Sequence, residues 1–327
     1  MISTALGAIA ARAVVILAFG AILVCVSEFW FYRVAEDVDS ILILLAYGLL
    51  GYLFFAVLYR FGVHTVAGLS VATCLLGFLI EGVAVPVVYA DLPISIVWTS
   101  LAWHALITFA AGWLLMRHVL ISGWVRSILF SAAFGLALGF WNGFMWNAQE
   151  DAVTGAFTYD WQPVDAFAEQ FLFGYLLFLV GHIVFDRFHT KSIAFRRGEH
   201  LALWAVAGVV SAIVAFDAGL LVAYPAFLGL VALCLFALAK EARADATPDP
   251  LAVHLTHHTH IPMVRFASTV LIPVCAILTY GFYVSNGLTI EMNVVMILTA
   301  GPISAVMFLW ALWTLLRRRG RKRNARG

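Results

Sequence analysis

The chain has 327 residues, of which 64% are apolar and 11% are charged, whereas soluble domains average roughly 45–50% apolar and about 25% charged residues. This composition excludes an ordinary soluble domain, and the 26 Phe, 11 Trp and 10 Tyr exclude intrinsic disorder. The 19 basic and 18 acidic residues leave a net charge of +1, so nothing in the overall charge indicates a nucleic-acid partner. The expected solvent is lipid, and membrane lipids are the expected partners.

Ten apolar stretches are long enough to cross a bilayer, which takes about 20 residues of helix. The seventh and eighth are separated only by Asp217-Ala218-Gly219, inside an apolar run that is too long for one crossing. We therefore predict an all-α, polytopic transmembrane helix bundle of ten spans. A single membrane domain covers residues 1–316, and a basic tail covers 317–327. The spans are placed at 10–32, 40–60, 65–89, 94–116, 123–147, 164–187, 199–217, 219–239, 264–285 and 292–316.

The basic residues predict the orientation of these spans, because Lys and Arg near helix ends stay on the cytoplasmic side. If the N-terminus is cytoplasmic, 18 of the 19 Lys and Arg lie in inner segments and only Arg33 lies outside. The pattern predicts that both termini are cytoplasmic and that the chain resides in the cytoplasmic (inner) membrane. We expect the first span to be retained, and we interpret the Arg-rich tail as a topology anchor.

Only three acidic residues, Glu28, Glu81 and Glu169, fall inside the predicted spans more than one residue from an end. A charged side chain within a span costs about 2.5–3.5 kcal/mol on insertion scales. Glu81 in span three lies about 12 Å from its outer end, and His104 in span four about 15 Å from its outer end. Asn142, Glu169 and Glu28 lie closer to the outer ends of spans five, six and one. We predict that a bundle of the first six helices gathers these five residues into one polar, outward-opening pocket, while the last four helices support it.

The sequence around Glu81 indicates a shaped site. Pro86 cannot donate to the helix ladder, so span three should kink or open next to Glu81. Thr73, Gly77 and Glu81 recur every four residues and form one small, polar face. Span four carries a matching face, and span five carries a stripe of small residues that allows another helix to approach closely. These two sets are Ser100, His104 and Thr108, and Gly135, Gly139 and Gly143.

Two interpretations of Glu81 and His104 remain open. In the first, they are a buried hydrogen-bonded pair that holds spans three and four together. In the second, they bind protons or substrate, because burial and mutual charge can move the pKa values of a Glu and a His toward neutrality. We expect the Glu81 carboxylate to lie within one water of His104 and to face an outer-half cavity. For Glu169 and Glu28, an interfacial position in contact with water is the alternative.

No metal or cofactor is expected. The segment HLTHHTH contains an H-x-x-H-H arrangement that resembles one histidine box of the membrane di-iron desaturases and hydroxylases. That resemblance implies a metal site built from several boxes, and the chain has only this one, so a solvated loop is the preferred interpretation of His254, His257, His258 and His260. His118 and His182 are a weaker candidate pair of haem ligands. Cys25, Cys74, Cys234 and Cys275 lie within spans and are interpreted as packing residues.

Three functions remain compatible with the sequence. The first is a secondary transporter of a small or lipophilic molecule, with proton coupling as one variant, because ten spans can form two inverted repeats with a broken helix in each. The second is a membrane-embedded enzyme that acts on a lipid or isoprenoid by Glu and His acid–base chemistry, with Asn142 orienting the head group. The third is an assembly or scaffold subunit. A scaffold predicts Glu81 bonded directly to His104 with no void beside them. A transporter predicts a water-accessible cavity that reaches the midplane and is bounded by both halves, and an enzyme predicts a pocket that opens sideways to the outer leaflet and is built from the first six helices alone.

Overall fold

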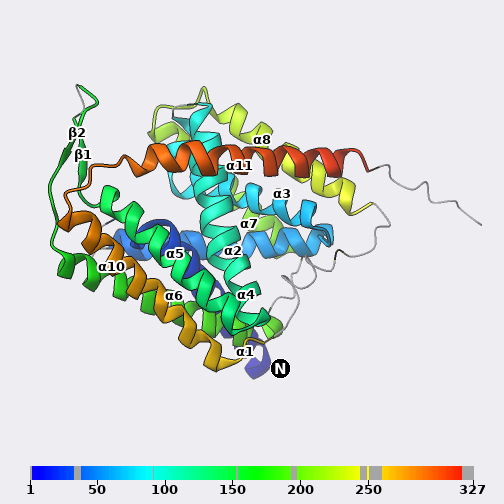
Figure 1. Cartoon of the computed structure of the whole chain (residues 1–327). Coiled ribbons are helices and arrows are strands. Elements are labelled where there is room, and N and C mark those ends of the chain that lie inside the picture. Colours follow the sequence, from blue (N-terminus) through cyan, green and yellow to red (C-terminus); the bar gives the residue numbers. More distant parts are fainter. Residues whose placement is uncertain are drawn as a thin grey trace, which may run out of the picture. The chain divides into compact units, whose positions relative to one another are not determined.

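The computed structural model describes residues 2–32, 38–90, 92–151, 154–192, 197–243, 249 and 260–318. Within these residues, ten helices are long and apolar enough to cross a membrane, which confirms the predicted number of membrane-length helices and supports a multi-pass membrane protein. Figure 1 shows the course of the chain. Most span boundaries agree with the sequence prediction to within a few residues, and three differ for identifiable physical reasons.

The first difference lies at the C-terminal end of span three. Helix α3 (Val66–Leu79) passes into the π-helical turn η2 (Ile80–Ala84), and Val85 is then extended. The chain resumes as the 3-10 segment η3 (Pro86–Tyr89). The helix therefore ends before Pro86, because the residue before a proline disfavours the helical conformation. This confirms the predicted break beside Glu81.

The other two differences concern spans four and eight. The π-helical segment η4 (Ile96–Leu115) continues into α4 (Met116–Ser122), so span four runs past Arg117 to Ser122 instead of ending at Met116. Helix α8 (Tyr224–Glu241) begins five residues later than predicted, because the turn at Gly219, which has φ of +69°, is followed by further turn residues. Pro225 stands in the first turn of α8, where its missing N–H costs nothing.

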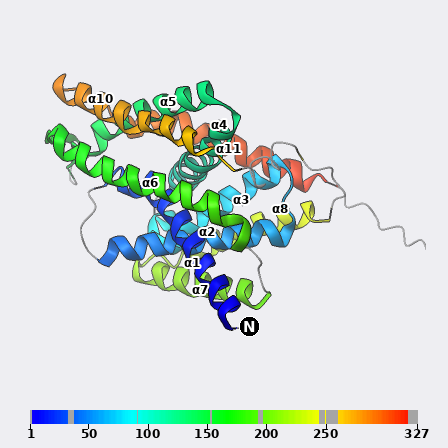
Figure 2. The same cartoon turned by 90° about the horizontal axis from the view of Figure 1, so that it is seen from below.

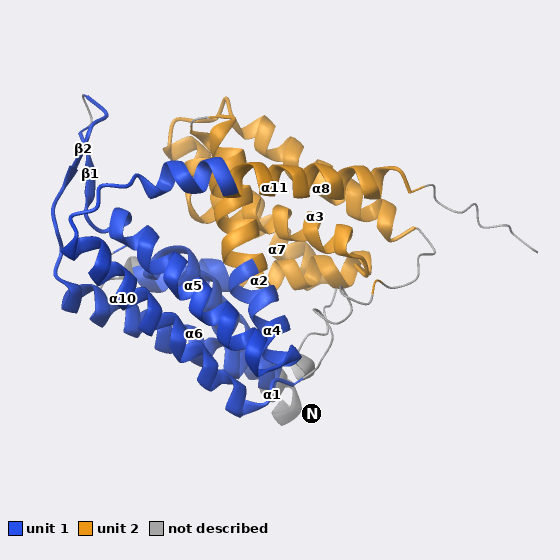
Figure 3. Cartoon of the chain, in the orientation of Figure 1, with its two compact units in different colours: residues 1–48, 111–192, 259–299 blue, residues 49–110, 193–258, 300–327 orange. Residues whose placement is uncertain are grey.

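The chain divides into two compact units, which Figure 3 colours separately. Unit 1 comprises 1–48, 111–192 and 259–299, and unit 2 comprises 49–110, 193–258 and 300–327. Three helical segments contribute to both units: α2 (Val38–Phe61), η4 and α11 (Met292–Leu316). Unit 1 also contains α1 (Ile2–Val24), η1 (Cys25–Phe29), α4, α5 (Trp124–Met145), β1 (Ala148–Glu150), β2 (Phe157–Tyr159), α6 (Val164–Ser192), η5 (Met263–Val270) and α10 (Leu271–Ser285). Unit 2 also contains α3, η2, η3, α7 (Arg197–Asp217) and α8.

Glycines allow close helix packing in unit 1. Figures 1 and 2 both show α5 beside α10. A Cβ atom on Gly135 or Gly139 would overlap backbone carbonyl oxygens of α10, and one on Gly143 would overlap the ring of Tyr283. The predicted small-residue stripe of span five is therefore the face against α10, and the close approach is confirmed. The two short strands β1 and β2 pair antiparallel, with Gln149 opposite Thr158.

Aromatic side chains fill the interior of each unit. In unit 1 the buried Trp30 ring stacks on Phe171, with centroids 5.0 Å apart. In unit 2 the rings of Phe54 and Phe109 meet edge to face at 4.5 Å. Such contacts add to apolar burial. In unit 2 the candidate span Val66–Ala84 is 94% buried.

Candidate functional site

Glu81 and His104 form a direct hydrogen bond in unit 2. The Oε1 atom of Glu81, in η2, lies 2.7 Å from Nε2 of His104, in η4. Both residues are 3% exposed. The predicted pairing of these residues is therefore present, and it needs no bridging water.

The backbone explains why these two side chains meet. A Cβ atom on Gly77 would overlap the carbonyl oxygen of Ser100, so the backbones of α3 and η4 touch at this point. Glu81 lies one turn beyond Gly77, in the π-helical turn η2 that continues α3, and His104 lies one turn beyond Ser100 in η4. The two four-residue patterns of small and polar residues thus face each other, because glycine permits an approach that any other residue would block.

Three buried polar atoms around this contact have no hydrogen-bond partner among the described residues. They are Oε2 of Glu81, Oγ of Ser100 and Oγ1 of Thr108. Nearly all buried polar atoms in native proteins are paired, so each such atom needs an explanation. The contact surface between α3–η2 and η4, here called the seam, therefore contains polar atoms that can form further hydrogen bonds beyond the Glu81–His104 contact.

An aromatic group packs against the backbone beside Glu81. The ring of Phe227 in α8 occupies the space that a side chain on Gly82 would need. The hydroxyl of Tyr89 donates to the carbonyl oxygen of Gly82 at 2.8 Å, which satisfies a group released by the helix break. Burial raises the pKa of the Tyr89 phenol, and the nearby Tyr224 raises it further, so Tyr89 stays a neutral donor.

The other three predicted site residues belong to unit 1. Glu28 is half-buried and accepts a 2.5 Å hydrogen bond from the hydroxyl of Tyr47. Asn142 is fully buried and donates to the carbonyl oxygen of Leu138 at 2.9 Å, while its Oδ1 has no partner among the described residues. Glu169 is exposed on α6. The single pocket predicted to unite all five residues stays a prediction.

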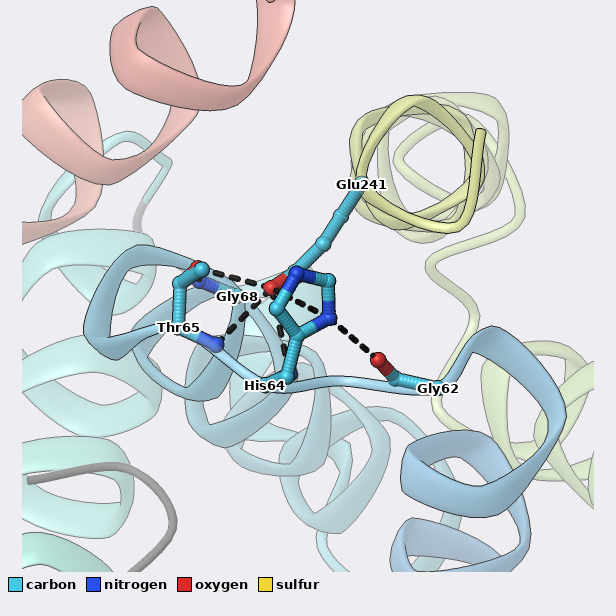
Figure 4. Close-up of polar contacts among 5 residues, drawn as sticks. All are labelled: Gly62, His64, Thr65, Gly68 and Glu241. Carbon is cyan, nitrogen blue, oxygen red and sulfur yellow. Dashed lines mark hydrogen bonds and ion pairs between the residues drawn. The ribbon is translucent and has the colours of Figure 1, made fainter. Parts of the chain in front are cut away.

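A second buried carboxylate, which the sequence did not single out, lies at the start of α3. Figure 4 shows that Glu241, the last residue of α8, reaches the N-terminus of α3. Its Oε1 accepts hydrogen bonds from the backbone N–H groups of His64 (3.2 Å) and Thr65 (2.9 Å) and from the Thr65 hydroxyl (2.7 Å). Thr65 itself caps the helix by accepting from the N–H of Gly68. The free N–H groups at a helix N-terminus suit such an anion.

A buried ion pair in unit 1 also escaped the sequence prediction. Nη1 of Arg117 lies 3.0 Å from Oδ1 of Asp186, and both side chains are almost fully buried. The other carboxylate oxygen of Asp186 accepts from the backbone N–H of Ile261 at 3.1 Å. The ring of His260 lies 3.0 Å from the backbone carbonyl of Asp186. A buried cation is thereby neutralised at the inner end predicted for spans four and six.

Three of the histidines weighed as metal or haem ligands, His118, His182 and His260, are described and have other contacts. His254, His257 and His258 lie outside the described residues, and His260 contacts Asp186 as described above. Nε2 of His182 lies 3.2 Å from the carbonyl oxygen of Gly112, and Nε2 of His118 lies 3.4 Å from Oγ of Ser122. Among the described residues, no group of three or more His, Cys, Asp or Glu side chains is placed to hold a metal ion.

Comparison of the chain with protein-family models, with curated proteins and with solved structures finds no match.

Proposed function

We propose that this chain is a secondary transporter of a small or lipophilic molecule in the cytoplasmic (inner) membrane, with Glu81 and His104 as its proton-responsive pair. The observation that carries this proposal is the unpartnered Oε2 atom of the buried Glu81. An intramembrane carboxylate is costly and typically marks a substrate or proton pathway. Its position beside a broken helix is typical of transporter binding sites.

The scaffold function has one specific observation in its favour, which is the direct contact between Glu81 and His104. A purely structural pair would, however, satisfy its own polar atoms, since an unpaired buried group costs about 1–3 kcal/mol. The hydroxyls of Ser100 and Thr108, on the same helical segment as His104, are two further buried polar groups without a partner among the described residues. Together they favour a seam that water or a ligand enters.

Water access to Ser100 separates the candidate functions without knowledge of the substrate. In a background in which the four cysteines are replaced by Ala, Ser100→Cys is exposed to a charged, membrane-impermeant methanethiosulfonate reagent. The reagent is applied to right-side-out and to inverted membrane vesicles. A transporter that alternates its access exposes this position to both sides in turn, so we expect labelling from both.

Matched controls define the background of this experiment. Ala102→Cys, on the same helix and fully buried, should stay unlabelled. Thr154→Cys in the exposed hairpin loop and Arg243→Cys after α8 should each react from one side. Labelling of Ser100→Cys from one side only would overturn transport and favour the enzyme. Absence of labelling from both sides would overturn it in favour of the scaffold.

The proton-responsive role is tested by Glu81→Gln in the same Ser100→Cys background. Gln keeps the shape and one acceptor oxygen for His104 but cannot ionise. We expect the ratio of outer to inner labelling to change, because the charge state of residue 81 then no longer biases one conformation over the other. A ratio identical to that of the Glu81 protein at every pH would contradict a proton-responsive Glu81.

A further inference from the structure

Two buried carboxylates lie at opposite ends of helix α3 in unit 2. Glu81 follows its C-terminal end, and Glu241 approaches its N-terminal end from α8. The helix has 14 residues, so its ends are about 21 Å apart at 1.5 Å per residue. Glu81 is 3% exposed and Glu241 is 0% exposed. Both carboxylates are therefore removed from bulk water.

The two sites share the same construction. In each, one carboxylate oxygen is hydrogen-bonded, while the Oε2 atom has no partner among the described residues. In each, a histidine lies beside the bonded oxygen, at 2.7 Å for His104 and at 3.7 Å for His64. In each, a glycine of α3 makes the approach possible, since a Cβ on Gly68 would overlap the Glu241 carboxylate. A structural cap alone would not require this repetition.

Building on the proposed function, we infer that Glu241 and His64 form a second proton-binding site, at the end of α3 that the charge pattern assigns to the cytoplasm. The transported proton is exchanged with water at this site, while Glu81 and His104 bind it at the other end of the helix.

The geometry assigns separate tasks to the two oxygens of Glu241. Oε1 accepts three hydrogen bonds from His64 and Thr65 and so holds the side chain in place whatever its charge. Oε2 takes up the proton by forming an O–H bond, and that bond breaks when the proton leaves for water. The His64 side chain is 21% exposed, whereas Glu241 is fully buried. The His64 Nδ1 lies 2.7 Å from the carbonyl oxygen of Gly62 (Figure 4), and its Nε2 is buried without a hydrogen-bond partner among the described residues. Of the two side chains, His64 is therefore the one with surface open to water.

The described elements around this site carry the following charged and titratable groups. Across the described residues, His64 provides the only ion-pair contact of Glu241. Helix α3 carries Cys74 as its sole titratable residue, and η3, which also packs on α8, carries Tyr89. Lys240 and Arg243 flank Glu241 in the chain, but the Lys240 ammonium lies over the ring of Phe236 at 5.2 Å. The backbone N–H of Asp249 donates to the carbonyl oxygen of His64 at 2.9 Å.

Infrared difference spectroscopy of the purified full chain between acidic and alkaline pH tests the inference. The unsubstituted chain should show carboxyl C=O bands from both of these non-aqueous sites. Glu241→Gln should remove one band and leave the other, and Glu81→Gln should do the reverse. Gln keeps an acceptor for the three donors at Glu241, and Glu150→Gln, in the exposed hairpin, should leave both bands in place. If Glu241→Gln leaves the carboxyl region unchanged, the inference is wrong.

A second variant avoids any dependence on the folding of Glu241→Gln. His64→Gln leaves the carboxylate and its backbone donors in place but removes the imidazole ring. We expect the frequency of the Glu241 band to shift, because the imidazole Nδ1 lies 3.7 Å from the carboxylate Oε1. An unshifted band would overturn the pairing. These spectra do not involve transport, so one-sided labelling of Ser100→Cys would reject the proposed function while leaving a proton site at Glu241 measurable.

Discussion

Replacing Gly77 by Ala tests the contact that brings Glu81 to His104. The added Cβ would overlap the carbonyl oxygen of Ser100, a backbone atom that no rotamer change can move. The helices α3 and η4 must therefore separate or rotate at this point. Because Glu81 lies one turn from Gly77, the same movement would stretch its 2.7 Å contact with His104.

The expected loss of stability is the sum of one stabilising and two destabilising contributions. Alanine is favoured over glycine inside a helix by about 0.8–1.0 kcal/mol. Overpacking a close contact costs about 1–3 kcal/mol. Losing a buried hydrogen bond with a charged or polar partner costs roughly 1–3 kcal/mol more. The net effect is a destabilisation of about 1–5 kcal/mol, so the clash outweighs the gain in helix propensity.

The thermal midpoint of the detergent-solubilised protein, followed by tryptophan fluorescence, measures this effect. Since 1 kcal/mol corresponds to roughly 2–4 °C in domains of 150–250 residues, we expect a fall of a few degrees or more. Gly208→Ala in α7 is the matched control, because a Cβ there meets no atom within 4 Å. The control should be neutral or slightly stabilising. Equal midpoints for the two variants would refute the close approach of α3 and η4.

Three further predictions follow from the remaining buried groups. Arg117→Met leaves Asp186 buried without its cation, so it should destabilise the fold by about 3–5 kcal/mol and lower the thermal midpoint. Adding Asp186→Leu should restore most of the lost stability. A double variant with the same midpoint as Arg117→Met would contradict the buried ion pair. Gly68→Ala should displace the Glu241 carboxylate and lower the thermal midpoint. A midpoint equal to that of the Gly208→Ala control would contradict the close contact between Gly68 and Glu241. Burial raises the pKa of Tyr159, so its neutral phenol contributes stability that is present below the unfolded value of about 10 and is lost as the pH rises further. The ultraviolet difference spectrum between the unsubstituted chain and Tyr159→Phe should place this ionisation above pH 10, and ionisation at the ordinary pH would refute the shift.

Local spacing was enough to anticipate the pairing of Glu81 with His104. Four-residue repeats place residues on one helix face, and the glycines among them mark where backbones approach. Pro86 indicated the helix break because its effect depends only on its immediate neighbours. These features are properties of short segments, so they could be found in the sequence.

Asp186 and Glu241 could not be found in this way. Both stand near the ends of their helices, where the sequence suggested contact with water, yet both are fully buried. Their burial depends on partners far along the chain: Arg117 is 69 residues from Asp186, and Thr65 is 176 residues from Glu241. In the sequence, each of them is simply a charged residue near the end of a hydrophobic stretch. Most charged residues at a membrane interface have such a position, so it does not indicate burial.

The sequence by itself determined that the chain is built from ten membrane-length helices and where most of them begin and end, because hydropathy is additive over short windows. Only the tertiary structure decided which carboxylate oxygens are paired and which are not. It placed Glu81 on His104 and Glu241 on the start of α3. The physical reason is that an intramembrane charge is stabilised by a specific partner, and the partner comes from another helix whose approach depends on packing.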